Sequence, residues 1–519
     1  MSRFRCSAPW YELNIQAPEN RVSACCYYYG KMPAWQEFSG DMSAVPRLWN
    51  HSDIQHIREI QTGQTYGRSG CDDCAYQSSG PYQGKPYFTF SSAVELSEKQ
   101  TWNLELAKEE FEKGIVKVRS LPLRYFIFFG YNCNLECKMC IQVPKRKLLD
   151  EEIETQLFSH WKAWFPFALT VDCIGGEPFS IPSAIQFMRE FVEDPELDMV
   201  RLGIFTNGIM VDKHLDWLRK KERVSFKVSL DSVGDSYEAI RFRGDWERVS
   251  ENLVTIRKLI DDEKPQWGVS TNALMMLSGI ESLPEFAAFH VQHRIRTSFY
   301  SLSYERGNEE ILYSEDIVQF PYLTDRVPLW RERFDEAIEI FASGDYSSEA
   351  EGLRVYRDMI VEARSQVGDV HKPTRTAASH DRDGIRDRIT AYRTIRPEDL
   401  VVSEKGFGFD APDNDSGVLL ELDTAELDPM NGFLTIRMTW QGAIIPKHVI
   451  RCQPVVHEAP GYDFLGLEKR QEGDTIIKDV YLRASGGEDT AAQSLQFRIT
   501  SVRPDEFSLL PDRLDILVA

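Results

Sequence analysis

Three cysteines stand close together in the sequence, at Cys133, Cys137 and Cys140. Three thiolates on one short segment can bind three irons of a [4Fe–4S] cluster, whereas a ferredoxin-type site would supply a fourth cysteine. With three protein ligands, one iron stays open to bind a substrate or a cofactor. A structural zinc site needs four closed ligands, and no histidine lies between His56 and His160 to complete one locally. The spacing therefore predicts an iron–sulfur cluster with one open position.

The length and composition describe a globular protein of several domains. The chain has 519 residues, of which 42% are hydrophobic and 27% are charged, and this is too long for one ordinary core. Its formal net charge of −21 makes nucleic acid a poor default partner, because such a surface repels a phosphate backbone. No apolar run approaches the length of a membrane helix, and no signal peptide is recognisable. We therefore expect a cytoplasmic protein with no membrane or nucleic-acid partner.

The region from about 118 to 330 alternates apolar strands with amphipathic helices. Their nearly continuous apolar runs are typical of a parallel sheet that is covered on both faces. Six βα units predict the α/β class and a partial (βα)6 TIM-type barrel, with the chemistry at the carboxyl ends of the strands. The expected strands lie at 125–130, 169–174, 200–205, 225–230, 266–272 and 297–302.

Smaller units are expected on both sides of this barrel. Residues 1–95 are rich in aromatic and turn residues and predict a small α+β module. This module has little aliphatic core of its own, so a bound metal cluster is a plausible source of its stability. Residues 331–396 predict a helical segment, to about residue 363, followed by a polar linker. From 397 to 519 apolar and polar residues alternate, which predicts an all-β, sandwich-like domain.

The three-cysteine segment directly follows the first expected barrel strand. In this position it resembles the cluster-binding loop of the radical S-adenosylmethionine (radical SAM) enzymes. Further motifs of that family follow at the ends of the next strands. The resemblance therefore covers about 118–305. One departure is Met139, where relatives usually carry an aromatic residue against adenine, although a thioether also packs on that ring. The residues that the resemblance assigns to SAM are Met139, Gly175, Gly176, Glu177, Pro178, Thr206, Asn207, Ser229, Asp231, Arg241 and Asn272.

The resemblance implies a role for each motif. The turn that starts at Gly175 would bind the amino group of the SAM methionine, with its glycines allowing backbone approach and Glu177 accepting from a cation. Ser229 and Asp231 would stand near the ribose, and Arg241 would face the carboxylate of SAM. The family's chemistry is the one-electron cleavage of SAM to methionine and a 5′-deoxyadenosyl radical, which abstracts a hydrogen atom from a substrate. A flavodoxin or a ferredoxin would supply the electron.

The N-terminal cysteines form a second ordered series: Cys6, Cys25, Cys26, Cys71 and Cys74. This series is similar to the twitch module, the shorter version of the SPASM domain, which binds an auxiliary iron–sulfur cluster in many radical SAM enzymes. There the module usually follows the barrel, whereas here it precedes it. The resemblance implies an auxiliary [4Fe–4S] cluster on Cys6, Cys71, Cys74 and one of the adjacent pair, with Cys25 favoured and Cys26 as the alternative. A zinc site on the same thiolates is the competing interpretation.

Three functions compete on this basis. The expected function is oxidation or epimerisation of a saccharide or glycan-linked substrate, since an auxiliary cluster can accept electrons and sandwich folds often bind sugars. A maturase that modifies a peptide or protein is the alternative, and a non-catalytic iron–sulfur or zinc scaffold with a β interaction module is the second alternative. The isolated Cys173 and Cys452 are predicted core residues. Cys173 has one other possible role, as a hydrogen-atom donor to a product radical.

Overall fold

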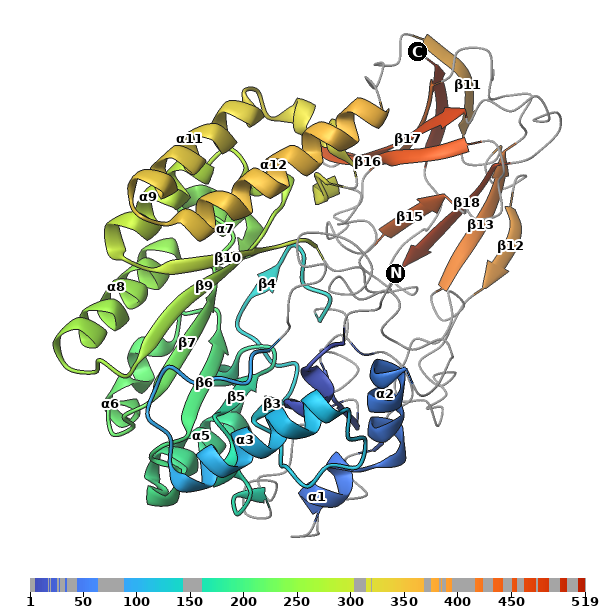
Figure 1. Cartoon of the computed structure of the whole chain (residues 1–519). Coiled ribbons are helices and arrows are strands. Elements are labelled where there is room, and N and C mark those ends of the chain that lie inside the picture. The colour runs from blue at the N-terminus through green and yellow to red at the C-terminus, as the bar shows by residue number, and fades with distance from the viewer. Residues whose placement is uncertain are drawn as a thin grey trace. The chain divides into compact units, whose positions relative to one another are not determined.

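The three-dimensional structure, a computed structural model, is drawn in Figure 1. The chain divides into two compact units. The first holds Met1–Ala273, Glu285–Phe299 and Glu339–Ala350, and the second holds Leu274–Pro284, Tyr300–Ile338 and Glu351–Ala519. The structure describes residues 5–16, 18, 20–25, 28, 33–34, 44–63, 88–142, 161–302, 314–318, 320–367, 375–381, 384, 389–393, 416–422, 433–441, 450–454, 462–472, 475–484, 495–501 and 512–518.

An eight-stranded sheet forms the frame of the first unit. Its strands are β1 (Glu12–Gln16), β2 (Arg21–Ser23), β3 (Arg124–Phe128), β5 (Thr170–Ile174), β6 (Arg201–Thr206), β7 (Val224–Ser229), β9 (Gly268–Leu274) and β10 (Arg296–Tyr300). Their order is β10-β9-β7-β6-β5-β3-β1-β2, and the pairings from β1 through β3, β5, β6 and β7 to β9 are parallel. The expected strands are present as β3, β5, β6, β7, β9 and β10, so the α/β class is confirmed.

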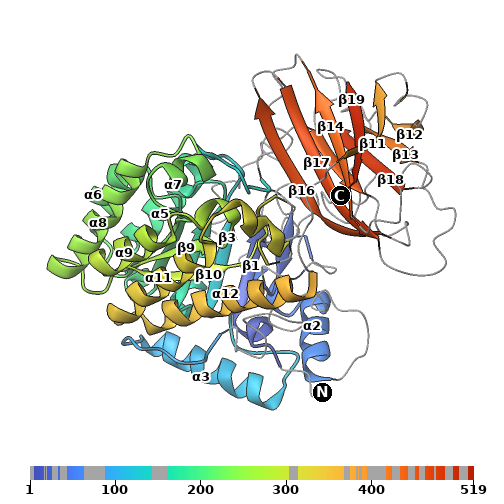
Figure 2. The ribbon, with the colours of Figure 1, turned by 90° about the horizontal axis from the view of Figure 1, so that it is seen from above.

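Helices lie along one side of this sheet, as the two views in Figures 1 and 2 show. They are α5 (Pro182–Glu193), α6 (Leu215–Leu218), α7 (Gly234–Ile240), α8 (Trp246–Asp262) and α9 (Leu283–His293). Helix α5 starts with a proline in its first turn, where the missing N–H is not needed. Helix α8 starts at Asp245, whose side chain accepts from the backbone N–H of Arg248.

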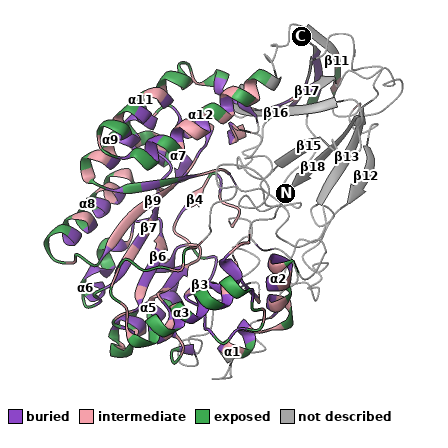
Figure 3. Cartoon of the chain, in the orientation of Figure 1, coloured by how far each residue is buried: buried purple, intermediate pink, exposed green. Residues whose placement is uncertain are grey.

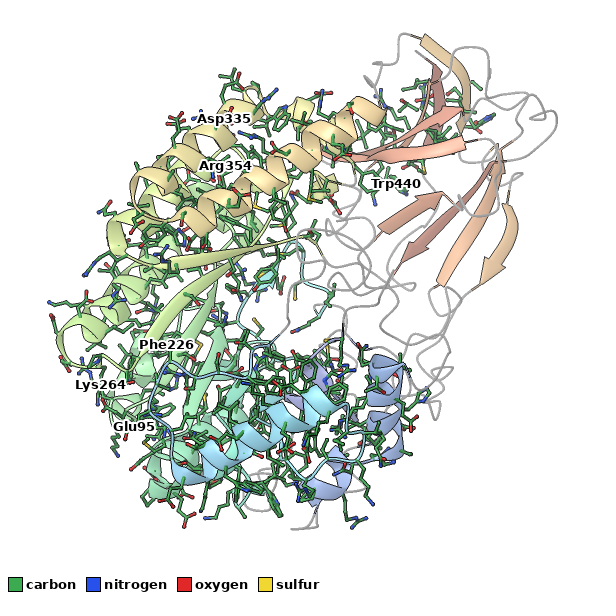
Figure 4. All side chains as sticks on the ribbon, viewed as in Figure 1. Glu95, Phe226, Lys264, Asp335, Arg354 and Trp440 are labelled. Carbon is green, nitrogen blue, oxygen red and sulfur yellow. The ribbon has the colours of Figure 1, made fainter. Side chains whose placement is uncertain are left out.

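The face of the sheet toward these helices, which we call the outer face, is apolar. Ile127, Cys173, Ile204 and Phe226 are in register on four neighbouring strands, and all four are 0% exposed. Figure 3 shows the burial of the sheet, and Figure 4 labels Phe226 on it. Burying such side chains contributes about 25 cal/mol for each Å² removed from water. The outer face therefore supplies much of the stability of the first unit.

The opposite face, which we call the inner face, carries charged side chains beside aromatic rings such as Phe126 and Phe205. The apolar runs predicted a sheet covered by apolar packing on both sides, but β7 alternates buried and half-buried residues. Arg124 connects two strands on the inner face: its Nη1 lies 2.6 Å from Glu12 Oε2, and its Nε lies 2.5 Å from Asp172 Oδ2. Gly203 leaves room for this network, since a Cβ there would lie 1.7 Å from Asp172 Oδ1. The inner face is thus the one that can carry chemistry.

The N-terminal segment adds β1 to this sheet, parallel to β3. Trp10 is fully buried, and its indole N–H donates to the backbone oxygen of Ile115 at 2.8 Å. Arg58 is also fully buried and donates to the backbone oxygen of Pro9 at 2.8 Å. The apolar side chains of the N-terminal segment are therefore buried through its pairing with the parallel sheet. Its helices are α1 (Ala44–Trp49) and α2 (Ser52–Thr62), followed by α3 (Glu98–Lys113) with a capping box of Ser97 and Gln100.

The second unit contains two antiparallel sheets. The five-stranded sheet has the order β11-β19-β14-β17-β16, and the four-stranded sheet has the order β12-β13-β18-β15. The all-β prediction for the C-terminal region is confirmed in this form. The strands are β11 (Arg375–Asp381), β12 (Ile389–Arg393), β13 (Ser416–Leu422), β14 (Phe433–Trp440), β15 (Ile450–Pro454), β16 (Tyr462–Glu472), β17 (Thr475–Ala484), β18 (Leu495–Ser501) and β19 (Arg513–Val518).

The segment between the barrel region and the C-terminal sheets differs in part from its prediction. The expected helical segment is present as α11 (Trp330–Ser343) and α12 (Ser347–Val367). Strands β11 and β12, however, lie where the polar linker was expected. Each stands at the end of the strand order of its sheet, and edge strands carry polar residues that discourage pairing with other chains. No described helix is long and apolar enough to cross a membrane.

Candidate active site

The three-cysteine segment follows β3 and is held by a short ribbon. Strand β4 (Glu136–Cys137) pairs antiparallel with β8 (Arg241–Phe242), with Cys137 opposite Arg241. The backbone N–H of Lys138 donates to Ile240 at 2.8 Å and extends this pairing by one residue. Cys133, Cys137 and Cys140 are half-buried and are not joined in disulfides. The ribbon thus fixes the middle cysteine of the motif.

N–H donors surround two of the three sulfurs. The backbone N–H of Leu135 lies 3.4 Å from Cys133 Sγ, and Asn207 Nδ2 lies 3.9 Å from the same atom. Asn207 Nδ2 also donates to Asn134 Oδ1 at 2.8 Å, which orients the amide. On the other side of the loop, Arg241 Nη1 lies 3.6 Å from Cys137 Sγ. Donors directed at sulfur suit thiolates that carry negative charge as cluster ligands.

Burial keeps the Cys137 thiol protonated while no metal is bound. It raises the pKa of Cys137 to about 12, against the opposing effect of Arg241, and the neighbouring Cys140 and Cys133 raise it further. A metal that binds here would displace the proton, because the ligand is the thiolate. Among the described residues, no three His, Cys, Asp or Glu side chains are arranged around one metal ion. A [4Fe–4S] cluster needs a different arrangement, because each cysteine binds a separate iron.

The glycines of the turn after β5 accommodate the chain's own backbone. Gly176 N donates to Gly130 O at 2.8 Å, and Glu177 N donates to Asn132 O at 2.8 Å. A Cβ on Gly176 would lie 2.2 Å from Asn132 O. The resemblance explained these glycines by the approach of a ligand, but the structure gives them a second reason. They let the turn pack against the segment that leads into the cysteines.

Glu177 connects this turn to the next strand end. Its carboxylate accepts from Thr206 Oγ1 at 2.8 Å, from the backbone N–H of Asn207 at 2.7 Å and from that of Phe179 at 3.1 Å. Burial raises its pKa to about 7, although these three hydrogen bonds and Arg241 lower it. The resemblance gave Glu177 the role of accepting from a cation. In the structure its oxygens accept from the protein, so it positions Asn207, which in turn contacts the first cysteine.

The remaining motif residues lie near the ends of β7 and β9, on β8 and on the cysteine loop. Ser229 ends β7 and is in register with Asn272 on β9. The Oδ1 atom of Asn272 is buried and has no hydrogen-bond partner among the described residues. Asp231 Oδ2 lies 2.7 Å from Arg241 Nη2. Met139, on the cysteine loop itself, is 8% exposed. The structure thus brings the motifs at the carboxyl ends of five parallel strands, β3, β5, β6, β7 and β9, to the same end of the sheet.

Lys227 is an inner-face residue that the sequence motifs did not identify. It is in register with Phe205, and its amine lies 5.9 Å from the centre of that ring. Burial lowers its pKa, and the nearby Asp172 opposes this effect. Its amine forms no hydrogen bond or ion pair with any described residue. The alternation of residues within β7 could have identified it from the sequence. Lys227 lies two residues before Ser229 and therefore on the same face of the sheet.

The other cysteine predictions are tested only in part. Cys173 is 0% exposed on the outer face, and burial raises its pKa well above the ordinary value. This confirms the core interpretation and argues against hydrogen donation to a substrate on the inner face. The backbone N–H of Cys6 donates to Gln61 Oε1 at 3.0 Å, and the backbone oxygen of Cys25 accepts from Ser23 Oγ at 2.6 Å. The predicted ligands Cys71 and Cys74, and the alternative Cys26, lie outside the described residues.

A family profile matches this part of the chain. The profile of the Radical SAM superfamily covers residues 127–289, which run from β3 to α9 and include the three cysteines and every strand-end motif. Residues 127–289 therefore form a radical SAM domain. Its parallel sheet is the partial barrel typical of that superfamily. A [4Fe–4S] cluster and SAM are the superfamily's cofactors, and the sulfur-directed donors around the loop fit such a cluster.

Individual relatives are more distant. The Dictyostelium discoideum protein "Molybdenum cofactor biosynthesis protein 1" is 26% identical over 196 residues, which cover 35% of this chain and 30% of that protein. Streptococcus suis SuiB bound to S-adenosylmethionine is 18% identical, with a TM-score of 0.33 over 47% of this chain and 55% of its own. The anSMEcpe structure with AdoMet and the Cp18Cys peptide is 14% identical, with a TM-score of 0.30 over 41% of this chain and 59% of its own. The family assignment rests on the profile match.

Proposed function

We propose that Cys133, Cys137 and Cys140 hold a [4Fe–4S] cluster at which this enzyme cleaves SAM reductively. The observation that carries the proposal is the set of N–H donors at Cys133 and Cys137, which Asn207 and Arg241 bring from other strand ends. Such donors stabilise thiolate ligands. When bound, the cluster supplies the electron that splits SAM into methionine and a 5′-deoxyadenosyl radical, and that radical abstracts a substrate hydrogen.

The chain's own residues would bind and orient SAM. Backbone groups of the Gly175–Pro178 turn lie beside the cysteine segment and would receive the amino group of the methionine. Ser229 and Asn272 are in register on neighbouring strands and would contact the adenosine part, where the buried Asn272 Oδ1 still needs a donor. Met139 would pack on the adenine. The inner face below them would keep the substrate beside the radical and exclude bulk water.

We further propose an auxiliary [4Fe–4S] cluster on Cys6, Cys71, Cys74 and Cys25, with Cys26 as the alternative to Cys25. An additional cluster can accept an electron from a product radical, which favours a net oxidation. Iron and sulfide analysis of the wild type and of a Cys71→Ala/Cys74→Ala variant tests this. The variant should lose about half of the iron and change the oxidation state of the product. A folded variant with full iron content would contradict the proposal, and tightly bound zinc would favour the zinc alternative.

For the substrate, we propose a peptide or protein in preference to a saccharide. The saccharide hypothesis depended on fold analogy with the C-terminal β region. In that region Trp440 is 2% exposed and thus unavailable for sugar stacking. The peptide proposal is supported by Lys227, whose amine needs an acceptor such as a peptide carbonyl or carboxylate. The neighbouring Phe205 and Phe126 rings, 5.2 Å apart, would contact apolar side chains.

The decisive experiment is anaerobic reconstitution followed by an assay of 5′-deoxyadenosine. Reductant-dependent formation of 5′-deoxyadenosine from SAM is expected with dithionite, and with a flavodoxin or a ferredoxin as the biological donor. A fully loaded protein that does not cleave SAM would favour the non-catalytic scaffold. Panels of peptides and saccharides should then be compared by how far each stimulates the cleavage. Stimulation by saccharides alone would overturn the peptide proposal without affecting the cluster.

A further inference from the structure

Arg241 contacts the cysteine loop through both its backbone and its side chain. In the β4–β8 ribbon it stands directly opposite Cys137. Its Nη1 lies 3.6 Å from Cys137 Sγ, and its Nη2 lies 2.7 Å from Asp231 Oδ2. The guanidinium is planar, so fixing one nitrogen on the carboxylate fixes the direction of the other. Asp231 therefore aims Arg241 at the sulfur.

The surroundings make this contact strong. The side chain of Arg241 is 8% exposed, and that of Asp231 is 1% exposed. Tyr237 is fully buried beside them; burial raises its pKa, Arg241 opposes this effect, and Cys137 and Asp231 add to it. With little water present, a charge and a hydrogen bond act on the sulfur with less screening than at a surface.

The backbone of Arg241 is held as firmly as its side chain. The N–H of Gly244 donates to the backbone oxygen of Arg241 at 2.6 Å. Between them Arg243 has a φ of 68°, which is uncommon for a residue with a side chain and costs free energy. A Cβ on Gly244 would lie 2.6 Å from the Arg241 oxygen. This tight turn fixes where β8 ends and therefore where Arg241 meets Cys137.

We propose that Arg241 is a positioning residue that donates to Cys137 Sγ and thereby raises the reduction potential of the cluster on the cysteine loop. The proposal rests on the proposed cluster. Reduction adds one electron, and a cation with an N–H directed at a ligand sulfur stabilises the more negative form. The resemblance implied a different role, contact with the carboxylate of SAM. The two roles differ in one respect: only donation to the sulfur acts on the cluster before SAM is present.

The test is a redox titration of the reconstituted full-length enzyme without SAM. Dithionite supplies the electrons in the presence of mediators, and EPR spectroscopy measures the reduced cluster. The signal that changes when SAM is added afterwards belongs to the cluster on the cysteine loop. Arg241→Gln is expected to shift the midpoint potential to more negative values, and Arg241→Lys, which keeps the charge, to shift it less. Arg243→Gln is the matched control, because Arg243 pairs with Glu136 of the same ribbon at 3.1 Å and its side chain is 60% exposed.

Iron and sulfide analysis of each variant separates this inference from the proposed function. If the wild-type loop binds no cluster, the proposed function fails. If Arg241→Gln carries the cluster at an unchanged potential and loses only affinity for SAM, the inference is overturned. If Arg241→Gln does not retain a cluster, Arg241→Lys is used instead. Its cluster is then measured both by redox titration and by resonance Raman spectroscopy. Unchanged iron–sulfur stretching frequencies together with an unchanged potential would then overturn the inference.

Discussion

The two faces of the parallel sheet are built from alternate residues of the same strands, yet they differ in almost every property. Phe226 on the outer face is fully buried among apolar side chains. The amine of Lys227, the next residue, lies on the inner face beside the Phe205 ring and forms no hydrogen bond or ion pair with a described residue. The outer face stabilises the fold through apolar burial. The inner face carries charged and polar groups such as the Arg124–Glu12–Asp172 network, whose burial costs solvation and is expected to add less net stability than apolar packing. Four substitution experiments can break or sharpen this comparison.

Cysteine substitutions should show the largest difference between the faces. Replacing Cys137 by Ala should reduce SAM cleavage to background, because the cluster loses one of its three ligands. Replacing Cys173 by Ala, on the outer face, should leave cleavage near the wild-type level and cost about 1 kcal/mol of stability. Measurements of 5′-deoxyadenosine and of urea unfolding check both variants. Loss of cleavage in a folded Cys173→Ala protein would contradict the assignment of that residue to the core.

Phe226→Ala should be the most destabilising of these changes. Removal of a fully buried ring from the outer face is expected to cost about 3–5 kcal/mol in the free energy of unfolding. Urea denaturation, followed by circular dichroism, measures this loss. A cost below about 1 kcal/mol would mean that the outer face is not the main source of stability, and the comparison between the faces would fail.

His290 should make the outer face sensitive to acid. Its Nε2 lies 2.7 Å from Thr271 Oγ1 and its Nδ1 lies 2.7 Å from Phe286 O. Burial lowers its pKa to about 4; the hydrogen bond to Phe286 opposes this effect, and His293 adds a smaller decrease. The unfolded chain has an ordinary pKa of about 6.5, so it binds the proton first. Stability is therefore full above pH ~6.5 and falls as the pH drops toward 4, by about 2 kcal/mol at pH 5.

To test this prediction, the unfolding free energy is measured at pH 7 and at pH 5, in the wild type and in His290→Gln. The glutamine can keep both hydrogen bonds but does not titrate, so its stability should change less between the two pH values. If both proteins lose the same amount of stability, a different group is responsible for the acid sensitivity.

Lys227→Met should have the smallest effect on stability and a selective effect on function. Removing a half-buried amine that forms no hydrogen bond or ion pair with a described residue should change the unfolding free energy by less than about 1 kcal/mol. The stimulation of SAM cleavage by a peptide substrate should fall about tenfold, as expected for loss of one charged contact. Lys227→Arg should retain part of the stimulation, and Lys264→Met, a change at an exposed ion pair with Glu222, should have no effect. Equal stimulation in Lys227→Met and the wild type would contradict a substrate contact.

Motifs that are local in sequence were the part of the site that the sequence could predict. The spacing of Cys133, Cys137 and Cys140 predicted an iron–sulfur loop, and the strand-end motifs predicted its neighbours in the correct order. Their partners could not be predicted in the same way. The bond from Asn207 to Cys133 and the ribbon that joins Cys137 to Arg241 connect residues far apart in the chain. Such contacts depend on how the strands align.

The N-terminal segment illustrates the same limit in the fold. From composition it was expected to be a module with little core of its own. The structure pairs β1 with β3, so Leu13 and Ile15 are buried in a sheet whose strands from β3 onward lie more than 100 residues later. Strand addition of this kind leaves no local signal, because the apolar partners belong to another part of the chain.

The sequence by itself determined the type of chemistry, because thiolate number and spacing decide how many irons a loop can hold. It also determined the α/β alternation, because apolar periodicity is a local property. The tertiary structure decided which role each motif residue takes. Glu177 and Arg241 carry charges that suit a bound ligand, yet burial and register direct them to Asn207 and to Cys137 Sγ. A charged side chain in a buried site takes the partner that the fold brings within reach, and only the packed structure specifies that partner.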